Sequence, residues 1–103
     1  MTITETYLTS LQGKIFKLLP MREAKEQGVD NHLEEYIDNL CANFDGAFSC
    51  HPELSNIREV AEVQGNLWAL KASVDGDFTK WRSTVLRSTR LIQTVLTKYY
   101  GEV

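Results

Sequence analysis

The stretch FTKWRSTVLRSTRLIQTVLTKYY, residues 78–100, carries the clearest helical pattern in this chain. Apolar or small residues recur in it at alternating intervals of three and four positions: Phe78, Trp81, Val85, Ser88, Ile92, Val95 and Tyr99. Because this spacing brings about one side chain per turn to the same face, it predicts a long amphipathic α-helix with that face buried. Asp77 can cap the first turn and Gly101 can end the helix, so both boundaries are marked in the sequence.

Three upstream segments show the same helical period. They span about residues 3–26, 32–50 and 57–74, and each is followed within a few positions by glycine or proline. Four amphipathic helices of similar length joined by short loops favour antiparallel neighbours, so the sequence predicts an all-α fold, an up-down-up-down four-helix bundle. The alternative is a three-helix core with the first segment packed across it. The periodicity places four large side chains in the core: Leu40, Phe44, Trp81 and Ile92.

Pro20 interrupts the pattern of the first segment. Its ring removes a backbone donor and crowds the carbonyl of Phe16, so the first helix should be kinked or broken at Pro20, with residues 21–26 continuing in a new direction. Asparagine precedes each of the two middle segments, which predicts N-caps at Asn31 and Asn56.

Length and composition favour one helical domain over residues 1–103. The chain has 103 residues, of which 43% are hydrophobic, enough for one packed core and too few for two. No apolar run approaches the roughly 18 residues of a membrane span, so we expect no membrane association. The N-terminal residues lack the basic and apolar regions of a signal peptide, and we therefore expect a cytoplasmic protein. The two cysteines, Cys41 and Cys50, stand about 13 Å apart on one predicted helix, beyond disulfide reach.

The sequence contains no catalytic constellation that we can identify. Its two histidines, His32 and His51, belong to no zinc or di-iron motif, and it has neither a P-loop nor a nucleophile elbow. We therefore expect no enzyme activity, no metal, no cofactor and no small-molecule substrate.

Charge is distributed unevenly along the chain. Residues 30–62 hold eight acidic residues and one base, whereas residues 79–100 hold five bases and no acid. Four of the acids share one side of the second segment and form either a solvated face or an acidic docking face: Glu34, Glu35, Asp38 and Asp45. Four bases of the last segment are the candidates for nucleic-acid contacts: Lys80, Arg87, Arg90 and Lys98.

The third segment has an apolar arc of about 160°, wider than the stripe of about 100° that a surface helix needs. Gln64 and Lys71 lie inside this arc. Either the helix is central, with Gln64 satisfied internally and Lys71 extending to solvent, or part of the arc faces another chain. In the second case the interface would consist of Ile57, Ala61, Gln64 and Trp68.

Together these patterns favour a non-catalytic protein–protein interaction module or a small accessory subunit. Such a chain is typical of accessory components of bacterial or phage assemblies, and its partner would be another protein or a second copy. The alternative is a small helical subunit that contacts nucleic acid through the basic face of residues 79–100, although the net charge of −3 opposes this.

Overall fold

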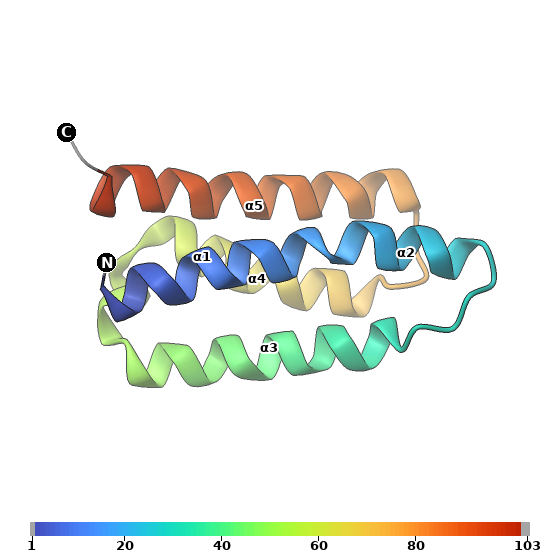
Figure 1. Ribbon diagram of the computed structural model, residues 1–103, viewed down its shortest axis with the longest axis horizontal. Coiled ribbons are helices and arrows are strands. Elements are labelled where there is room, and N and C mark those ends of the chain that lie inside the picture. Colours follow the sequence, from blue (N-terminus) through green and yellow to red (C-terminus); the bar gives the residue numbers. More distant parts are fainter. Residues whose placement is uncertain (1, 102–103) are drawn as a thin grey trace.

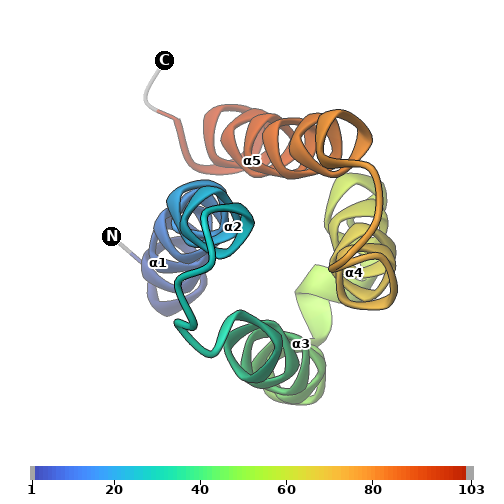
Figure 2. The ribbon, with the colours of Figure 1, turned by 90° about the vertical axis from the view of Figure 1, so that its right-hand side faces the viewer.

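The computed structural model describes residues 2–101, and every regular element in that range is helical. The elements follow in the order α1 (Ile3–Phe16), α2 (Leu18–Glu26), α3 (Leu33–Cys50), the 3-10 helix η1 (Pro52–Asn56), α4 (Arg58–Ala72) and α5 (Phe78–Tyr100). Figure 1 shows them side by side along the longest dimension of the molecule, which is 44 Å. In the end view of Figure 2, α1 with α2, α3, α4 and α5 surround a common centre. The prediction of an all-α fold is confirmed.

The core combines the apolar faces of all these helices into one cluster. The four predicted core residues Leu40, Phe44, Trp81 and Ile92 are all buried in it. Ser88, the polar member of the α5 series, is also buried, and its hydroxyl donates a hydrogen bond to the carbonyl of Thr84 at 2.8 Å. In the part of the chain that the structure describes, no helix is both long enough and apolar enough to cross a membrane.

The last turn of α5 departs from the predicted pattern. Tyr99, which continues the spacing of three and four, is 49% exposed. The neighbouring Tyr100 packs partly against the core instead. The assignment of Tyr99 to the buried face was therefore wrong. A straight α-helix has slightly more than 3.5 residues per turn, so positions that follow a strict heptad rotate slowly around it, and Tyr99, the seventh residue of the series, no longer lies on the buried face.

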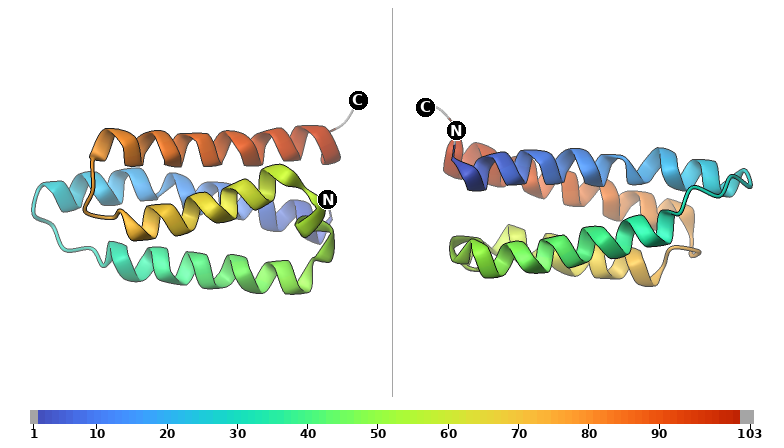
Figure 3. Two further views of the ribbon diagram at one scale, coloured as in Figure 1. Left: turned by 180° about the vertical axis from the view of Figure 1, so that it is seen from behind. Right: turned by 60° about the horizontal axis from the view of Figure 1, so that its bottom comes forward.

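The first segment is divided at Lys17, three residues before Pro20. Pro20 is the third residue of α2 and lies in its first turn, where the backbone N–H groups have no acceptor within α2 itself. Residues 18–26 continue as a helix, and Figure 3 shows α1 and α2 following one another along the same side of the molecule.

Of the N-caps predicted at Asp77, Asn31 and Asn56, the first is confirmed and the other two are wrong. The Asp77 carboxylate accepts a hydrogen bond at 3.2 Å from the backbone N–H two residues later and caps α5 as predicted. Asn31 does not cap α3, because its side-chain amide donates to the carbonyl of Met21 at 2.9 Å and ties α2 to the following loop. His32 occupies the cap position instead, with a left-handed backbone at φ 58°. Asn56 belongs to η1, so it does not cap α4 either.

Candidate protein-binding surface

Two acidic side chains of α3 reach across to polar side chains of α4. The Asp45 carboxylate accepts a hydrogen bond from the Gln64 amide at 2.7 Å, and the Asp38 carboxylate lies 3.2 Å from the Lys71 ammonium. These contacts satisfy both polar groups that interrupt the apolar arc of α4. Gln64 is paired within the molecule and Lys71 extends to the surface, as the first of the two accounts of this arc required.

Trp68 lies on the same helix and remains 45% exposed. The Lys71 ammonium sits 4.7 Å from the centre of its ring, so the indole carries a cation on one face. Gly65 and Ala61, one and two turns before Trp68, are exposed as well. The indole therefore projects from a stretch of α4 with small side chains. The α4 ribbon lies toward the viewer in the left panel of Figure 3.

Ile57 does not belong to this surface. It is 7% exposed and is part of the core, which corrects its assignment to the interface. The helix begins only at Arg58, and Ile57 has an extended backbone with φ −99° and ψ 112°. The 100° rotation per residue of an α-helix therefore cannot be extrapolated back to Ile57, and its side chain turns inward. Ala61, Gln64 and Trp68, together with Lys71, constitute what we call the Trp68 surface.

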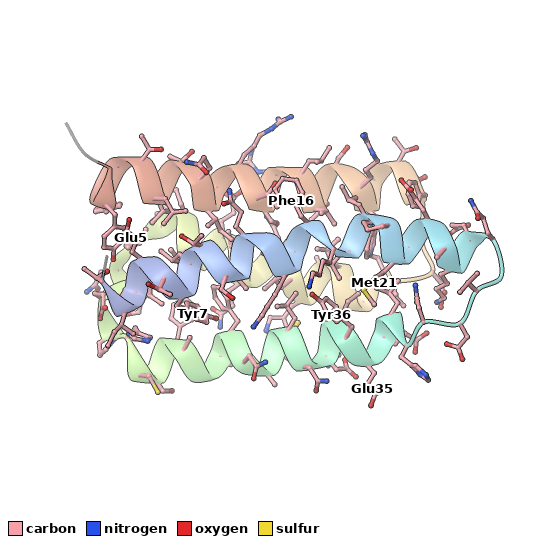
Figure 4. The ribbon with its side chains drawn as sticks, viewed as in Figure 1. Glu5, Tyr7, Phe16, Met21, Glu35 and Tyr36 are labelled. Atoms are coloured by element: carbon pink, nitrogen blue, oxygen red, sulfur yellow. The ribbon has the colours of Figure 1, made fainter. Side chains whose placement is uncertain are left out.

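The four acidic residues of α3 do not act as one free face. Asp38 and Asp45 are engaged with α4, as described above. Glu34 and Glu35 remain exposed and make only long contacts, at 3.5 Å to the ammonium of Lys25 and 3.9 Å to the imidazole of His32. Figure 4 shows Glu35 pointing away from the other helices. Asp38 thus lies where the acidic side of α3 meets the Trp68 surface, and Glu34 lies on the solvent-exposed part of that side.

A shallow hollow of about 200 Å³ lies where α3 and α4 meet. It is lined by Glu34, Ile37, Asp38, Lys71 and Val74. Its walls combine two carboxylates with two aliphatic side chains, and the Lys71 ammonium is the one cation among the lining residues. The hollow connects the acidic side of α3 with the Trp68 surface.

A larger hollow of about 460 Å³ lies at the loop between α2 and α3. Its lining includes the exposed Val29 and the imidazole of His32 but no phenylalanine, tyrosine or tryptophan. Lys25, which also lines it, is committed to Asp75 at 2.5 Å. With no large aromatic side chain as an anchor and with the Lys25 ammonium already paired, this hollow is a weaker candidate than the Trp68 surface.

The basic residues of α5 are only partly available. Arg87 is paired with Glu62 of α4, with 2.6 Å between the guanidinium Nε and the carboxylate. Lys80, Arg90 and Lys98 are exposed and form no ion pair with any other residue between 2 and 101. The stripe is therefore interrupted in its middle.

An aromatic ring accompanies this basic stripe at its C-terminal end. Tyr99 is exposed, and the Lys98 ammonium lies 5.3 Å from the centre of its ring. The heptad pattern had assigned this tyrosine to the buried face. Its exposure gives the C-terminal end of α5 a cation beside an accessible ring.

Arg22 is an internal polar centre that the sequence analysis missed. It is 2% exposed, and its guanidinium lies 5.3 Å from the ring centre of Phe78 and 5.2 Å from that of Trp81. It also donates a hydrogen bond to the carbonyl of Gly76, which fastens α2 to the loop between α4 and α5. The available signal was its position four residues after Leu18, which continues the apolar series of the first segment.

A second polar cluster lies at the other end of the molecule. The Thr4 hydroxyl donates a hydrogen bond to Glu53 of η1 and keeps only a 3.4 Å contact with the imidazole of His51. The Tyr7 ring stacks on His51 with 6.2 Å between ring centres. Burial, with a smaller effect of the Asp45 carboxylate, raises the pKa of Tyr7 to about 12. Because the Thr4 proton is given to a carboxylate and not to the imidazole, the cluster fastens η1 to α1 and does not form a nucleophile–base pair.

Between residues 2 and 101, no group of three or more histidine, cysteine, aspartate or glutamate side chains could hold a metal ion. The Trp68 surface offers apolar contact at the indole, hydrogen bonding at Gln64 and ion pairing at Lys71. Comparison of the chain with protein-family models, with curated proteins and with solved structures finds no match.

Proposed function

We propose that this chain is a non-catalytic helical protein–protein interaction module, a small accessory subunit of a larger cytoplasmic assembly, and that Trp68 anchors its partner. The observation that carries the proposal is the 45% exposure of Trp68 beside the small side chains of α4. Tryptophan is enriched among the few residues that dominate binding energy in protein interfaces. Covering a half-exposed indole with a second surface removes apolar area from water and lowers the free energy of the complex.

The surroundings of Trp68 support a protein partner. Ala61 and Gly65 leave room for the backbone of another chain to approach α4 closely. The Asp45 carboxylate accepts a hydrogen bond from the Gln64 amide at 2.7 Å, so this pair keeps its hydrogen bond when the surface is covered. An apolar centre with paired polar groups at its edge is the usual arrangement of a protein interface.

Sedimentation velocity on the purified chain tests the proposal, with Trp68→Ala as the test variant and Tyr99→Ala as the control. Both residues are exposed aromatics, so the two substitutions remove comparable surface. We expect association in the parent protein, loss of association in Trp68→Ala and no change in Tyr99→Ala. Thermal melts should be nearly unchanged in both variants. Association that is equal in both variants would refute a role for Trp68.

The alternative that we place second is a nucleic-acid-contacting subunit that uses α5. Its support is the exposure of Lys80, Arg90 and Lys98 together with the Tyr99 ring, and the pairing of Arg87 with Glu62 counts against it. Binding of DNA or RNA through phosphate contacts should weaken steeply between low and moderate salt. Salt-sensitive binding that Arg90→Glu abolishes would favour this alternative.

We also propose that the molecule is one domain, an up-down-up-down four-helix bundle whose first member consists of α1 and α2. This is supported by Figure 1, where successive members start from opposite ends of the molecule. We attribute the interruption at Lys17 to Pro20, which cannot donate to the carbonyl of Phe16. Pro20→Ala restores this donor, so its amide N–H should be protected from hydrogen exchange. Rapid exchange of that N–H would argue for another cause.

A further inference from the structure

We propose that the partner presents an arginine-containing basic segment to the α3–α4 side of this molecule, and that Lys71 occupies in the free chain the place of the partner's arginine. The inference rests on the proposed function and adds the chemistry of the partner.

The position of Lys71 defines this chemistry. Its ammonium lies 4.7 Å from the centre of the Trp68 ring and 3.2 Å from the Asp38 carboxylate. The Lys71 ammonium thus contacts the face of the Trp68 ring and the Asp38 carboxylate at the same time. The side chains of Lys71 and Asp38 are 40% and 54% exposed, so water competes for both and the contact is weakly held. Another cation can displace Lys71 at small cost.

The charge around this place favours a basic partner. Glu34 and Asp38 both line the hollow of about 200 Å³ beside Lys71, and Glu35 lies on the neighbouring exposed side of α3. The nearest cation to Glu34 is Lys25 at 3.5 Å, and Lys25 binds Asp75 more closely, at 2.5 Å. The carboxylates therefore keep an excess of negative charge at this surface, which steers basic partners toward it and repels acidic ones.

The size of the hollow and the type of contact favour an arginine side chain. Pockets for small molecules usually enclose about 300–1,000 Å³, so a shallow hollow of about 200 Å³ fits one inserted side chain better. A guanidinium is planar, stacks on an indole and donates two parallel hydrogen bonds to a carboxylate, whereas an ammonium does neither as well. Trp68 and Asp38 provide both of these acceptors.

Titration with a hexa-arginine peptide tests the proposal, with hexa-lysine and hexa-glutamate as comparison peptides. Tryptophan fluorescence reports the binding directly, because Trp68 is exposed while Trp81, the other tryptophan, is buried. We expect saturable binding of hexa-arginine, weaker binding of hexa-lysine and none of hexa-glutamate. Binding of hexa-glutamate, or no saturable binding of hexa-arginine, would overturn the proposal.

Calorimetric titration of variants separates this site from general attraction between a basic peptide and an acidic protein. Trp68→Ala and Asp38→Asn should each weaken hexa-arginine binding by roughly fivefold, since each removes one of the two contacts. Glu23→Gln, which removes an equal charge from an exposed position on α2, should change affinity less than about twofold. Equal effects of Asp38→Asn and Glu23→Gln would refute a defined site.

If the arginine of the partner displaces Lys71, removal of Lys71 should strengthen binding, whereas removal of Trp68 or Asp38 should weaken it. Lys71→Ala frees the Trp68 ring and the Asp38 carboxylate and should tighten hexa-arginine binding by roughly three- to fivefold. Lys80→Ala removes the same charge from an exposed position on α5 and should tighten it less. Equal effects of the two lysine variants would overturn the stand-in role of Lys71.

Failure of this inference is distinguishable from failure of the proposed function. If sedimentation reveals association that depends on Trp68 while hexa-arginine binding does not, the Trp68 surface is an interface and the basic partner is wrong. If neither depends on Trp68, both proposals are wrong. Circular-dichroism melts of every variant confirm that the compared proteins are folded.

Discussion

Arg22→Ala should reduce the free energy of unfolding by about 4 kcal/mol, because Arg22 is buried and its contacts join α2 to the α4–α5 loop and to the first turn of α5. The substitution removes two buried methylene groups, which contribute about 0.8 kcal/mol each. The hydrogen bond from the charged guanidinium to the carbonyl of Gly76 adds about 1.5–3 kcal/mol. The ion pair with Glu26, at 2.7 Å, contributes little because that carboxylate is half exposed. A loss of this size is a large fraction of the stability of a small domain.

Arg22→Met separates the packing of this side chain from its charge. Methionine retains the length of the stem between the rings of Phe78 and Trp81, and it removes the need to desolvate a guanidinium. It leaves the carbonyl of Gly76 without this donor, so we expect a loss of about 1–2 kcal/mol, less than half that of alanine.

Urea unfolding followed by circular dichroism measures these differences. Arg82→Ala, at an exposed position on α5, serves as the control and should change stability by less than about 0.5 kcal/mol. An Arg22→Ala protein within about 1 kcal/mol of the parent would refute the burial argument. If methionine and alanine are equally destabilising, the contribution of Arg22 to the free energy of unfolding comes from its charge and not from the packing of its side chain.

Three further predictions follow from burial. Phe44→Ala should lower the free energy of unfolding by about 3–5 kcal/mol in urea titrations, and an unchanged midpoint would show that the core face of α3 is assigned wrongly. The pKa of Tyr7 is raised from 10.0 to about 12, so its contribution to stability is complete below pH 10 and is lost as the pH rises through about 12. Tyr7→Phe should remove this part of the alkaline loss in thermal melts, and an unaltered pH profile would contradict it. Burial also raises the pKa of the Cys41 thiol, whereas Cys50 is exposed, so a thiol reagent should label the native chain once, at Cys50, and the unfolded chain twice. Labelling of Cys41 in the native state, located by mass spectrometry, would disprove its burial.

Local information in the sequence was sufficient for the helices and much of the core. The predicted bounds of residues 78–100 agree with those of α5, and Asp77 caps that helix as expected. Phe44 and Trp81 are buried as their spacing predicted. These features depend on helical periodicity and on hydrogen bonds between residues close in sequence, so each can be worked out from a single segment.

The candidate surface was only partly predictable. The width of the apolar arc on α4 pointed to Trp68, Gln64 and Lys71, but the periodicity could not decide whether these residues face a neighbouring helix or solvent. Ile57 was misplaced because the helical rotation was extended beyond the point where α4 begins.

Tertiary structure alone decided which polar groups meet. Whether Asp45 reaches Gln64, or Arg22 reaches the carbonyl of Gly76, depends on the axial register and rotation of helices that are far apart in sequence. Burial of Arg22 follows from the same packing, since the rings of α5 enclose a side chain whose own segment gives it no partner except Glu26. A segment's pattern determines which of its faces turns inward, and only the packing of the helices determines what that face touches.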